Sequence, residues 1–211
     1  MTLIELNQSL SNCQRCKLAG LGRSQVVFGV GNPHARIMFV GEAPGFYEDK
    51  QGEPFVGAAG KLLNELLQSV GLSRSEIYIA NVIKCRPPNN RDPEPDEVET
   101  CKPFLLQQIE MIQPKLVCTL GNWATRTLLE KNVGITKVRG QAIRRDKFVM
   151  FPLLHPAAAL HQGNLRMPLE EDFQKLRTYL DQLDSPPSKA NETTRIENPP
   201  AHSPQIQMDL F

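Results

Sequence analysis

The sequence lacks the features that mark membrane, secreted and strongly basic proteins. None of its apolar runs approaches the roughly 18 residues needed to cross a bilayer, which excludes a membrane-spanning protein. The first ten residues contain no basic segment followed by an apolar one, so we expect no secretory signal and a cytoplasmic location. The formal net charge of +1 excludes a protein that coats DNA through a large excess of positive charge, but it allows a locally basic binding face.

The five cysteines are few enough to consider one by one. In a cytoplasmic chain they are expected to be metal ligands, reactive thiols or core residues rather than disulfides. Cys13 and Cys16 form a C-x2-C pair, Cys85 follows an apolar run, and Cys101 lies in a predicted helix. Four thiolates can hold zinc or an iron–sulfur cluster, and the single C-x2-C pair favours iron–sulfur because zinc ribbons normally have two. Cys118, inside the apolar run VCTL, is predicted to lie in the core.

The composition changes near residue 184 and divides the chain into a domain, 1–184, and a tail. Residues 185–204 contain five of the 17 prolines, and Ile196 is their only aliphatic residue larger than alanine. Such a segment cannot bury enough apolar surface to offset the entropy of ordering it, so we predict a disordered linker. Residues 205–211 become apolar again and form a short tip.

Predicted strands and helices alternate along residues 1–184. Apolar runs between turn residues predict strands at 36–40, 77–83 and 115–121, with a final pair at about 141–154. Helical periodicity and capping residues predict helices at 2–11, 61–70, 96–113, 122–131 and 169–183, with Pro103 kinking or breaking the third. This alternation is typical of an α/β protein whose parallel or mixed sheet has helices on both faces.

Polar residues follow these predicted strands beside glycine or proline. Strand 36–40 runs into Gly41, Glu42 and Ala43, strand 77–83 contains Asn81, and the last strand ends at His155. One such strand end by itself indicates a tight turn. Because the carboxyl ends of parallel strands meet at one edge of a sheet, the convergence of Glu, Asn and His predicts a site there.

Four motifs together carry a resemblance to a known family. GEAPG at 41–45, PFVGAAGKLL at 54–63, NVIKCRPPNNRDPEPDE at 81–97 and LLHPAAAL at 153–160 resemble, in order, the motifs of family 4 uracil-DNA glycosylases. These are the iron–sulfur members of their superfamily, and the resemblance covers about residues 1–182. It implies a three-layer α/β/α sandwich with a central, mostly parallel four-stranded sheet. It also implies a [4Fe–4S] cluster held by Cys13, Cys16, Cys85 and Cys101.

The activity that the resemblance implies is the repair of DNA damage by base excision. A hydrolase of this class flips uracil out of DNA, hydrolyses its N-glycosidic bond and leaves an abasic site. Phe55 matches the residue that stacks on the flipped base, and Asn81 matches the amide that donates to uracil O4 and accepts from N3–H. His155 matches the histidine that stabilises the charge growing on O2. Backbone N–H groups of Gly41 to Ala43 are expected to face the base or the water.

The residue that activates the water is the open part of this interpretation. Better-known branches of the superfamily carry Asp or Asn where this chain has Ala43, which cannot act as a base. Three explanations for the activation of the water remain. The base is Glu42, the water is held by backbone groups, or the reaction follows a dissociative route through a sugar cation. We favour the dissociative route with electrostatic help from His155, and Glu42 as a pocket residue that positions water. By analogy with the family, Glu48 is a candidate for excluding the thymine methyl group, the alternative being a solvated surface charge.

Binding to DNA requires contacts with phosphates and a way to replace the flipped base. Lys84, Arg86 and Arg91 flank the Asn81 segment and are candidates for phosphate contacts. The segment from 156 to 166 matches the family's loop that enters the duplex, where Leu160 is the predicted wedge and Arg166 the phosphate ligand.

The last five residues resemble the pentapeptide by which bacterial proteins bind the DNA sliding clamp, with Met in place of the first Leu. The predicted contacts are Gln207, Met208, Leu210 and Phe211. A peptide at the end of a flexible tether reaches a groove at little cost. The alternative is a hydrophobic end without a partner. We expect a monomer associated with the nucleoid.

Two other functions compete with excision of uracil. A related subgroup captures uracil-DNA covalently through a histidine in a basic inserted loop, but RPPNNRDPEPDE at 86–97 has no histidine and no such insertion. A non-catalytic cluster-bearing module that binds DNA would release no base.

Overall fold

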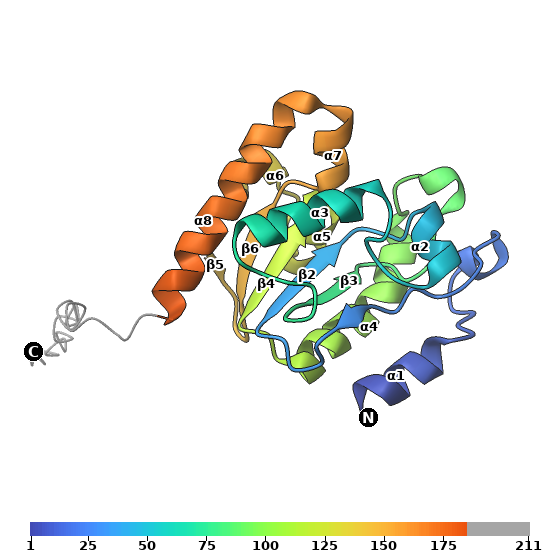
Figure 1. Ribbon diagram of the computed structural model, residues 1–211. Coiled ribbons are helices and arrows are strands. Elements are labelled where there is room, and N and C mark those ends of the chain that lie inside the picture. The colour runs from blue at the N-terminus through green and yellow to red at the C-terminus, as the bar shows by residue number, and fades with distance from the viewer. Residues whose placement is uncertain (185–211) are drawn as a thin grey trace, which may run out of the picture.

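The computed structural model describes residues 1–184, which form a three-layer α/β/α sandwich (Figure 1). The predicted linker, 185–204, and the candidate clamp peptide, 205–211, lie outside the described residues. Four parallel strands in the order β3-β2-β4-β6 form the middle of the sheet. Their bounds are β2 Ile37–Gly41, β3 Tyr78–Asn81, β4 Leu116–Leu120 and β6 Val149–Leu153. The α/β class and the mostly parallel sheet are as expected.

The sheet has six strands rather than the expected four. β1 (Val30–Gly31) pairs with β3 and β5 (Ile143–Arg144) pairs with β6, both antiparallel, at the two edges of the sheet. β5 and β6 are the final pair of strands predicted at about 141–154, whereas β1 was not predicted, since two residues are too few for an alternating hydrophobic pattern.

Side chains of the parallel strands alternate between two buried layers. In β2, Phe39 points to one layer and Met38 to the other, as the two-residue period of a strand requires. The first layer is covered by α3 (Ala58–Ser69) and α8 (Arg166–Asp184), and the second by α4 (Pro95–Ile112) and α5 (Gly121–Leu129).

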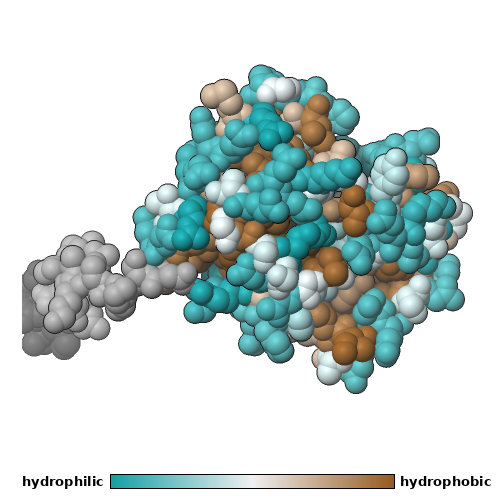
Figure 2. Space-filling view, viewed as in Figure 1, coloured by the Kyte–Doolittle hydropathy of each residue, from teal (hydrophilic) through white to brown (hydrophobic). Residues whose placement is uncertain are grey.

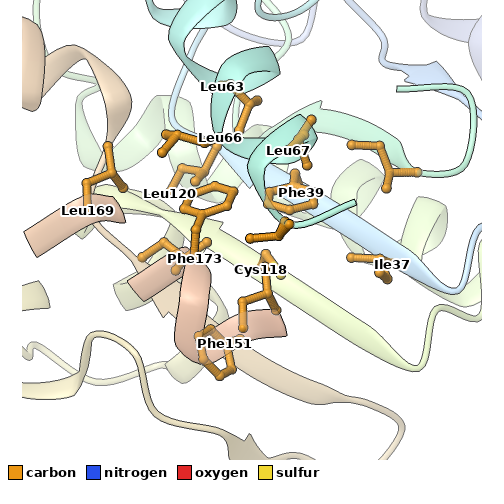
Figure 3. Close-up of a cluster of buried hydrophobic side chains, with 14 of the residues drawn as sticks. Ile37, Phe39, Leu63, Leu66, Leu67, Cys118, Leu120, Phe151, Leu169 and Phe173 are labelled. Atoms are coloured by element: carbon orange, nitrogen blue, oxygen red, sulfur yellow. The ribbon is translucent and has the colours of Figure 1, made fainter. Parts of the chain in front are cut away.

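Figure 3 shows the first layer, in which leucines of α3 and Phe173 of α8 pack over Phe39 and Cys118. Cys118 is fully buried there, which confirms the predicted core position. Outside this layer the molecule is mostly hydrophilic on the face shown in Figure 2, with apolar side chains scattered among polar ones. In the part of the chain described here, no helix is long and apolar enough to cross a membrane.

The predicted long helices are present. α1 (Leu3–Leu10) begins with the expected capping box, because the side chains of Thr2 and Glu5 bond each other's backbone N–H groups. α4 is a single helix with Pro103 inside it, so the proline does not break the helix at that exposed position.

The remaining helical segments are short and were not predicted. They are α2 (Phe46–Gln51), α6 (Ile135–Val138), α7 (Pro156–His161) and the 3-10 turns Lys17–Gly20, Pro88–Asn90 and Gly163–Leu165.

Candidate active site

A pocket of about 330 Å³ lies at the carboxyl edge of the parallel strands. Side chains from the predicted strand ends meet there, together with residues of α2, α3 and α7. Its lining includes Glu42, Ala43, Pro44, Gly45, Glu48, Phe55, Ala59, Asn81, Pro87, Asn90, Arg91, His155, Ala157 and His161. The structure thus brings together the Glu, Asn and His that the sequence placed at this edge.

Asn81 is the last residue of β3 and is only 2% exposed. Its Oδ1 has no hydrogen-bond partner among residues 1–184. A buried amide oxygen without a partner costs about 1–3 kcal/mol, so its presence in a pocket points to a ligand that donates a hydrogen bond. The backbone carbonyl of Asn81 accepts a bond of 2.8 Å from Lys84 Nζ, which fixes this end of the strand.

Gly41 lies opposite Asn81 in the register of β2 and β3. A Cβ on Gly41 would come within 2.4 Å of Asn81 Oδ1 and 2.7 Å of the Phe55 ring. Any side chain here would displace both groups, so the glycine keeps the pocket open between the amide and the aromatic ring.

Phe55 adopts the left-handed backbone conformation, with φ of +56°, which is unfavourable for a residue with a side chain. Arg74 holds it in place by donating from Nη1 to the Phe55 carbonyl at 3.0 Å and from Nη2 to the Pro54 carbonyl at 2.8 Å. Gly60 leaves room for this turn, because a Cβ there would lie 1.8 Å from the Phe55 oxygen.

Glu48 holds the same turn from the other side. Its Oε1 accepts hydrogen bonds of 3.0 Å from the N–H groups of both Val56 and Gly57. Glu48 is therefore a half-buried residue of the pocket wall and not a freely solvated surface charge.

His155 follows β6 and caps the amino end of α7. Its Nδ1 accepts from the Ala157 N–H at 3.1 Å, so the proton of the neutral ring is on Nε2. Burial lowers the pKa of His155 to about 4, against the opposing effect of the Glu48 charge, and the ring is therefore neutral at pH 7. The Phe55 and His155 ring centroids are 5.7 Å apart. The pocket thus presents an aromatic ring, an amide and a neutral imidazole.

Glu42 is the ionisable residue of the first strand exit. Burial raises its pKa to about 7, and the charge of Asp92 acts in the same direction. Ala43, its neighbour in the pocket lining, brings no ionisable group. A carboxyl group that titrates near neutral pH is suited to accept a hydrogen bond or a proton from water.

The candidate DNA contacts fall into different environments. The prediction for Lys84 was wrong: its side chain is 2% exposed, and its Nζ bonds the Asn81 carbonyl and Gln108 Oε1 rather than facing solvent. Arg91 lines the pocket, where it forms a two-pronged ion pair with the buried Glu97. This pairing leaves it less able to bind phosphate than expected.

The other three candidates lie at the surface. The Arg86 guanidinium lies 5.0 Å from the centroid of the Phe46 ring. Leu160 is 47% exposed on α7, as a wedge would be. Arg166 is exposed and pairs with Glu65 and Glu170.

The four predicted metal ligands line one small cavity between the N-terminal segment and α4. Cys13, Cys16, Cys85 and Cys101 all contribute to it. Arg23 Nη1 donates to Cys85 Sγ at 2.8 Å, and the Lys84 N–H lies 3.3 Å from Cys101 Sγ. Among residues 1–184, no three His, Cys, Asp or Glu side chains are placed to hold a single metal ion.

Sequence reasoning missed the residues that support this site. Arg74 and Arg23 lie outside the predicted strand ends, and Gly60 lies in the motif at 54–63 without a polar group to mark it. The only sequence signal for Arg74 is a charged residue in the turn before β3, and nothing in that pattern indicates that it reaches Phe55.

The comparisons with known proteins agree with this geometry. Residues 28–182 match the model of the uracil DNA glycosylase superfamily, so the chain belongs to that superfamily. The type-4 uracil-DNA glycosylase of Sulfurisphaera tokodaii is 49% identical over 83% of this chain and 84% of its own length. Those of Thermotoga maritima and Archaeoglobus fulgidus are 46% and 44% identical, each over 83% of this chain and over 93% and 92% of their own lengths. Within the superfamily, the chain is a member of the type-4 uracil-DNA glycosylases.

Proposed function

We infer that this chain removes uracil from DNA by hydrolysing its N-glycosidic bond, which leaves an abasic site for base excision repair. The observation that carries this inference is the unpartnered Oδ1 of Asn81, buried in a pocket that also holds Phe55 and His155. The type-4 relatives support the same activity.

The pocket selects uracil through the Asn81 amide. Its Oδ1 accepts the N3–H of uracil and its amino group donates to O4, while Phe55 stacks on the ring. Cytosine has an acceptor at N3 and an amino group at position 4, so it would set like groups against each other and leave the amide unsatisfied. The free energy of binding should therefore be less favourable for cytosine than for uracil by about the free energy of two lost buried hydrogen bonds.

His155 stabilises the leaving group as the bond breaks. Its neutral ring presents Nε2–H, which donates to uracil O2 as negative charge develops there. Because uracil departs as an anion, it needs a hydrogen bond from His155 and no transferred proton. A neutral imidazole can supply that hydrogen bond. We propose a dissociative route in which Glu42, in its ionised form, orients the water that adds to the sugar.

Glu48 has two roles in this proposal. Its hydrogen bonds to Val56 and Gly57 hold the turn that carries Phe55, and its side chain fills the pocket wall where a thymine methyl group would have to fit.

We propose that Cys13, Cys16, Cys85 and Cys101 hold a [4Fe–4S] cluster. The four side chains share a cavity but are not placed for one ion, which would need every sulfur about 2.3 Å from a single point. A cluster would spread its four thiolate ligands over four irons, so it would not need all four sulfurs at one ion. Burial raises the pKa of Cys85 to about 11 and also raises that of Cys101, while the hydrogen bonds from Arg23 and the Lys84 N–H act in the opposite direction and favour the thiolates that a cluster would need. When bound, the cluster would serve as a cross-link between the N-terminal segment and α4.

Alkaline cleavage of a uracil-containing oligonucleotide tests the activity. The cluster-loaded protein should produce strand breaks at uracil after alkali, and the absence of breaks would contradict the proposed function. Asn81→Asp and His155→Ser should each lower the single-turnover rate by about 100-fold or more. The matched controls are Asn132→Asp and His34→Ser, which change exposed residues outside the pocket and should keep the wild-type rate.

For the C-terminal tip we propose docking to the DNA sliding clamp by a protein that is itself a monomer and acts at the nucleoid in the cytoplasm. The support is the sequence QMDLF at 207–211. Deletion of residues 207–211 should abolish co-elution with the clamp and leave uracil release from short oligonucleotides unchanged. Continued co-elution of the truncated chain would overturn the docking proposal.

A further inference from the structure

Helix α2 is arranged against the usual pattern of a surface helix. Glu48 faces the pocket, and Asp49 is 1% exposed because its carboxylate accepts the Ser24 N–H. Phe46 and Tyr47, in contrast, are 47% and 60% exposed. A surface helix normally turns its aromatic side chains inward and its carboxylates outward. The reversed arrangement exposes two aromatic rings to solvent next to the pocket. Figure 1 shows the position of α2.

These rings lie next to the pocket, because their chain neighbours Gly45 and Glu48 both line it. Tyr47 lies against Gly57, with its Cδ2 3.5 Å from the position of a Cβ on that glycine. The Phe46 ring meets the Tyr47 ring edge to face at 5.4 Å, and the Arg86 guanidinium lies 5.0 Å from the Phe46 centroid. Arg86 Nε donates to Oδ1 of Asn90, which lines the pocket. We call Tyr47, Phe46 and Arg86 the aromatic rim.

The charges of the rim match a nucleic acid. Arg86 uses only Nε for its bond to Asn90, so its two terminal nitrogens have no hydrogen-bond partner among residues 1–184. Lys50 adds a second cation, with Nζ 6.0 Å from the Phe46 centroid. Exposed rings interleaved with cations form the platforms on which unpaired bases stack while their phosphates are held.

We propose that the aromatic rim binds an unpaired nucleobase next to the flipped uracil in single-stranded DNA. Tyr47, the more exposed ring, stacks on that base, Phe46 supports Tyr47 from the side, and Arg86 binds the adjoining phosphate. This inference rests on the proposed function and assigns a binding site beyond the uracil pocket. In a duplex the neighbouring base stays paired and stacked, so the rim contributes more to single-stranded DNA than to double-stranded DNA.

The affinity for a single-stranded oligonucleotide tests the rim. The oligonucleotide carries a 2′-fluorinated deoxyuridine, which resists cleavage, and its binding is followed by fluorescence anisotropy. Tyr47→Ala should weaken binding by about 10-fold, with a smaller loss on the matching duplex, while Tyr47→Phe keeps the ring and the affinity. Leu106→Ala, which truncates an exposed apolar side chain on α4, is the matched control and should bind like the wild type. Equal affinities of Tyr47→Ala and the wild type would overturn the proposal.

Removing the neighbouring base separates stacking from other causes. Two further oligonucleotides lack the base on the 5′ or the 3′ side of the uracil. One of them should bind the wild type more weakly, and on that oligonucleotide Tyr47→Ala should cause no further loss. An undiminished effect of Tyr47→Ala on both would exclude stacking. Wild-type protein that releases uracil but fails these tests overturns the rim alone, whereas protein that binds through the rim but releases no uracil overturns the proposed function alone.

Discussion

Burial favours the neutral form of both Glu42 and His155 in the pocket, but it shifts their pKa values in opposite directions. The pKa of His155 falls to about 4, and that of Glu42 rises to about 7. Between pH 6 and pH 8 the imidazole therefore stays neutral while the carboxyl group ionises. The two residues can be distinguished by a pH profile because only one of them titrates in this range.

The rate of uracil release should rise with pH through about 7. Only the ionised form of Glu42 accepts a hydrogen bond from water at both oxygens, and with a pKa of about 7 its population increases about tenfold from pH 6 to pH 8. Single-turnover rates of the wild type should follow that increase. Glu42→Gln should lower the rate at pH 8 by about 100-fold and give a flat profile. A variant that keeps the pH-dependent rise would assign the titration to another group.

The sequence located Asn81, Phe55 and His155 because each lies in a motif at or near a strand end. It failed for Lys84, since charge alone suggests the surface, and lysine is rarely buried without a partner. The partner that permits burial is Gln108, which is 24 positions away on α4. A pattern of neighbouring residues in the sequence cannot predict this contact. The orphan oxygen of Asn81 is likewise a property of the folded site and not of the sequence.

The short helices α2 and α7 contribute Glu48, Ala157 and His161 to the pocket, and the sequence did not predict these two helices. The long strands and helices have enough apolar residues for their period to be recognised, whereas α2 and α7 have six residues each. The turn that carries Phe55 has no regular structure at all. Its conformation is imposed from outside by Glu48 and Arg74, which lie seven residues before it and 19 after it in the chain.

Arg74→Ala should weaken the binding of uracil by releasing Phe55 from its strained conformation. The change removes donors to two carbonyl groups, which should lower the free energy of unfolding by about 1–3 kcal/mol and raise the inhibition constant of free uracil about tenfold. Arg74→Lys should restore little, because an ammonium group does not reproduce the fork that meets both carbonyls. Product inhibition and thermal unfolding measure the two effects.

A double-mutant cycle is the control for this interpretation. If Arg74 acts through Phe55, the double variant with Phe55→Ala should bind uracil no more weakly than Phe55→Ala alone. Fully additive losses would show that Arg74 affects binding by another route.

At the scale of the whole molecule, three apolar clusters are unequal in size. Among residues 1–184, two of them fill the layers on either side of the sheet, while the buried members of the third are Leu6 and Leu10 of α1, Phe28 and Phe104. Hydrophobic stabilisation is roughly proportional to the apolar area removed from water, so the N-terminal segment gains much less from packing than the sheet does. The cysteine cavity lies beside this small cluster, and Leu10 and Phe104 belong to both.

Loss of the proposed cluster should therefore loosen the N-terminal segment before the sheet. Cys101→Ser should remove the broad visible absorbance of the purified protein and make the bonds after Arg15 and Lys17 susceptible to trypsin, since those side chains now rest on Phe104 and on Glu94 and Asp96. The matched control is Cys118→Ala, which changes a buried cysteine outside the cavity and should keep both the colour and the protection of these sites. A Cys101→Ser protein that stays coloured and resists trypsin would contradict the ligand set, and a colourless wild-type protein that contains zinc would contradict the cluster.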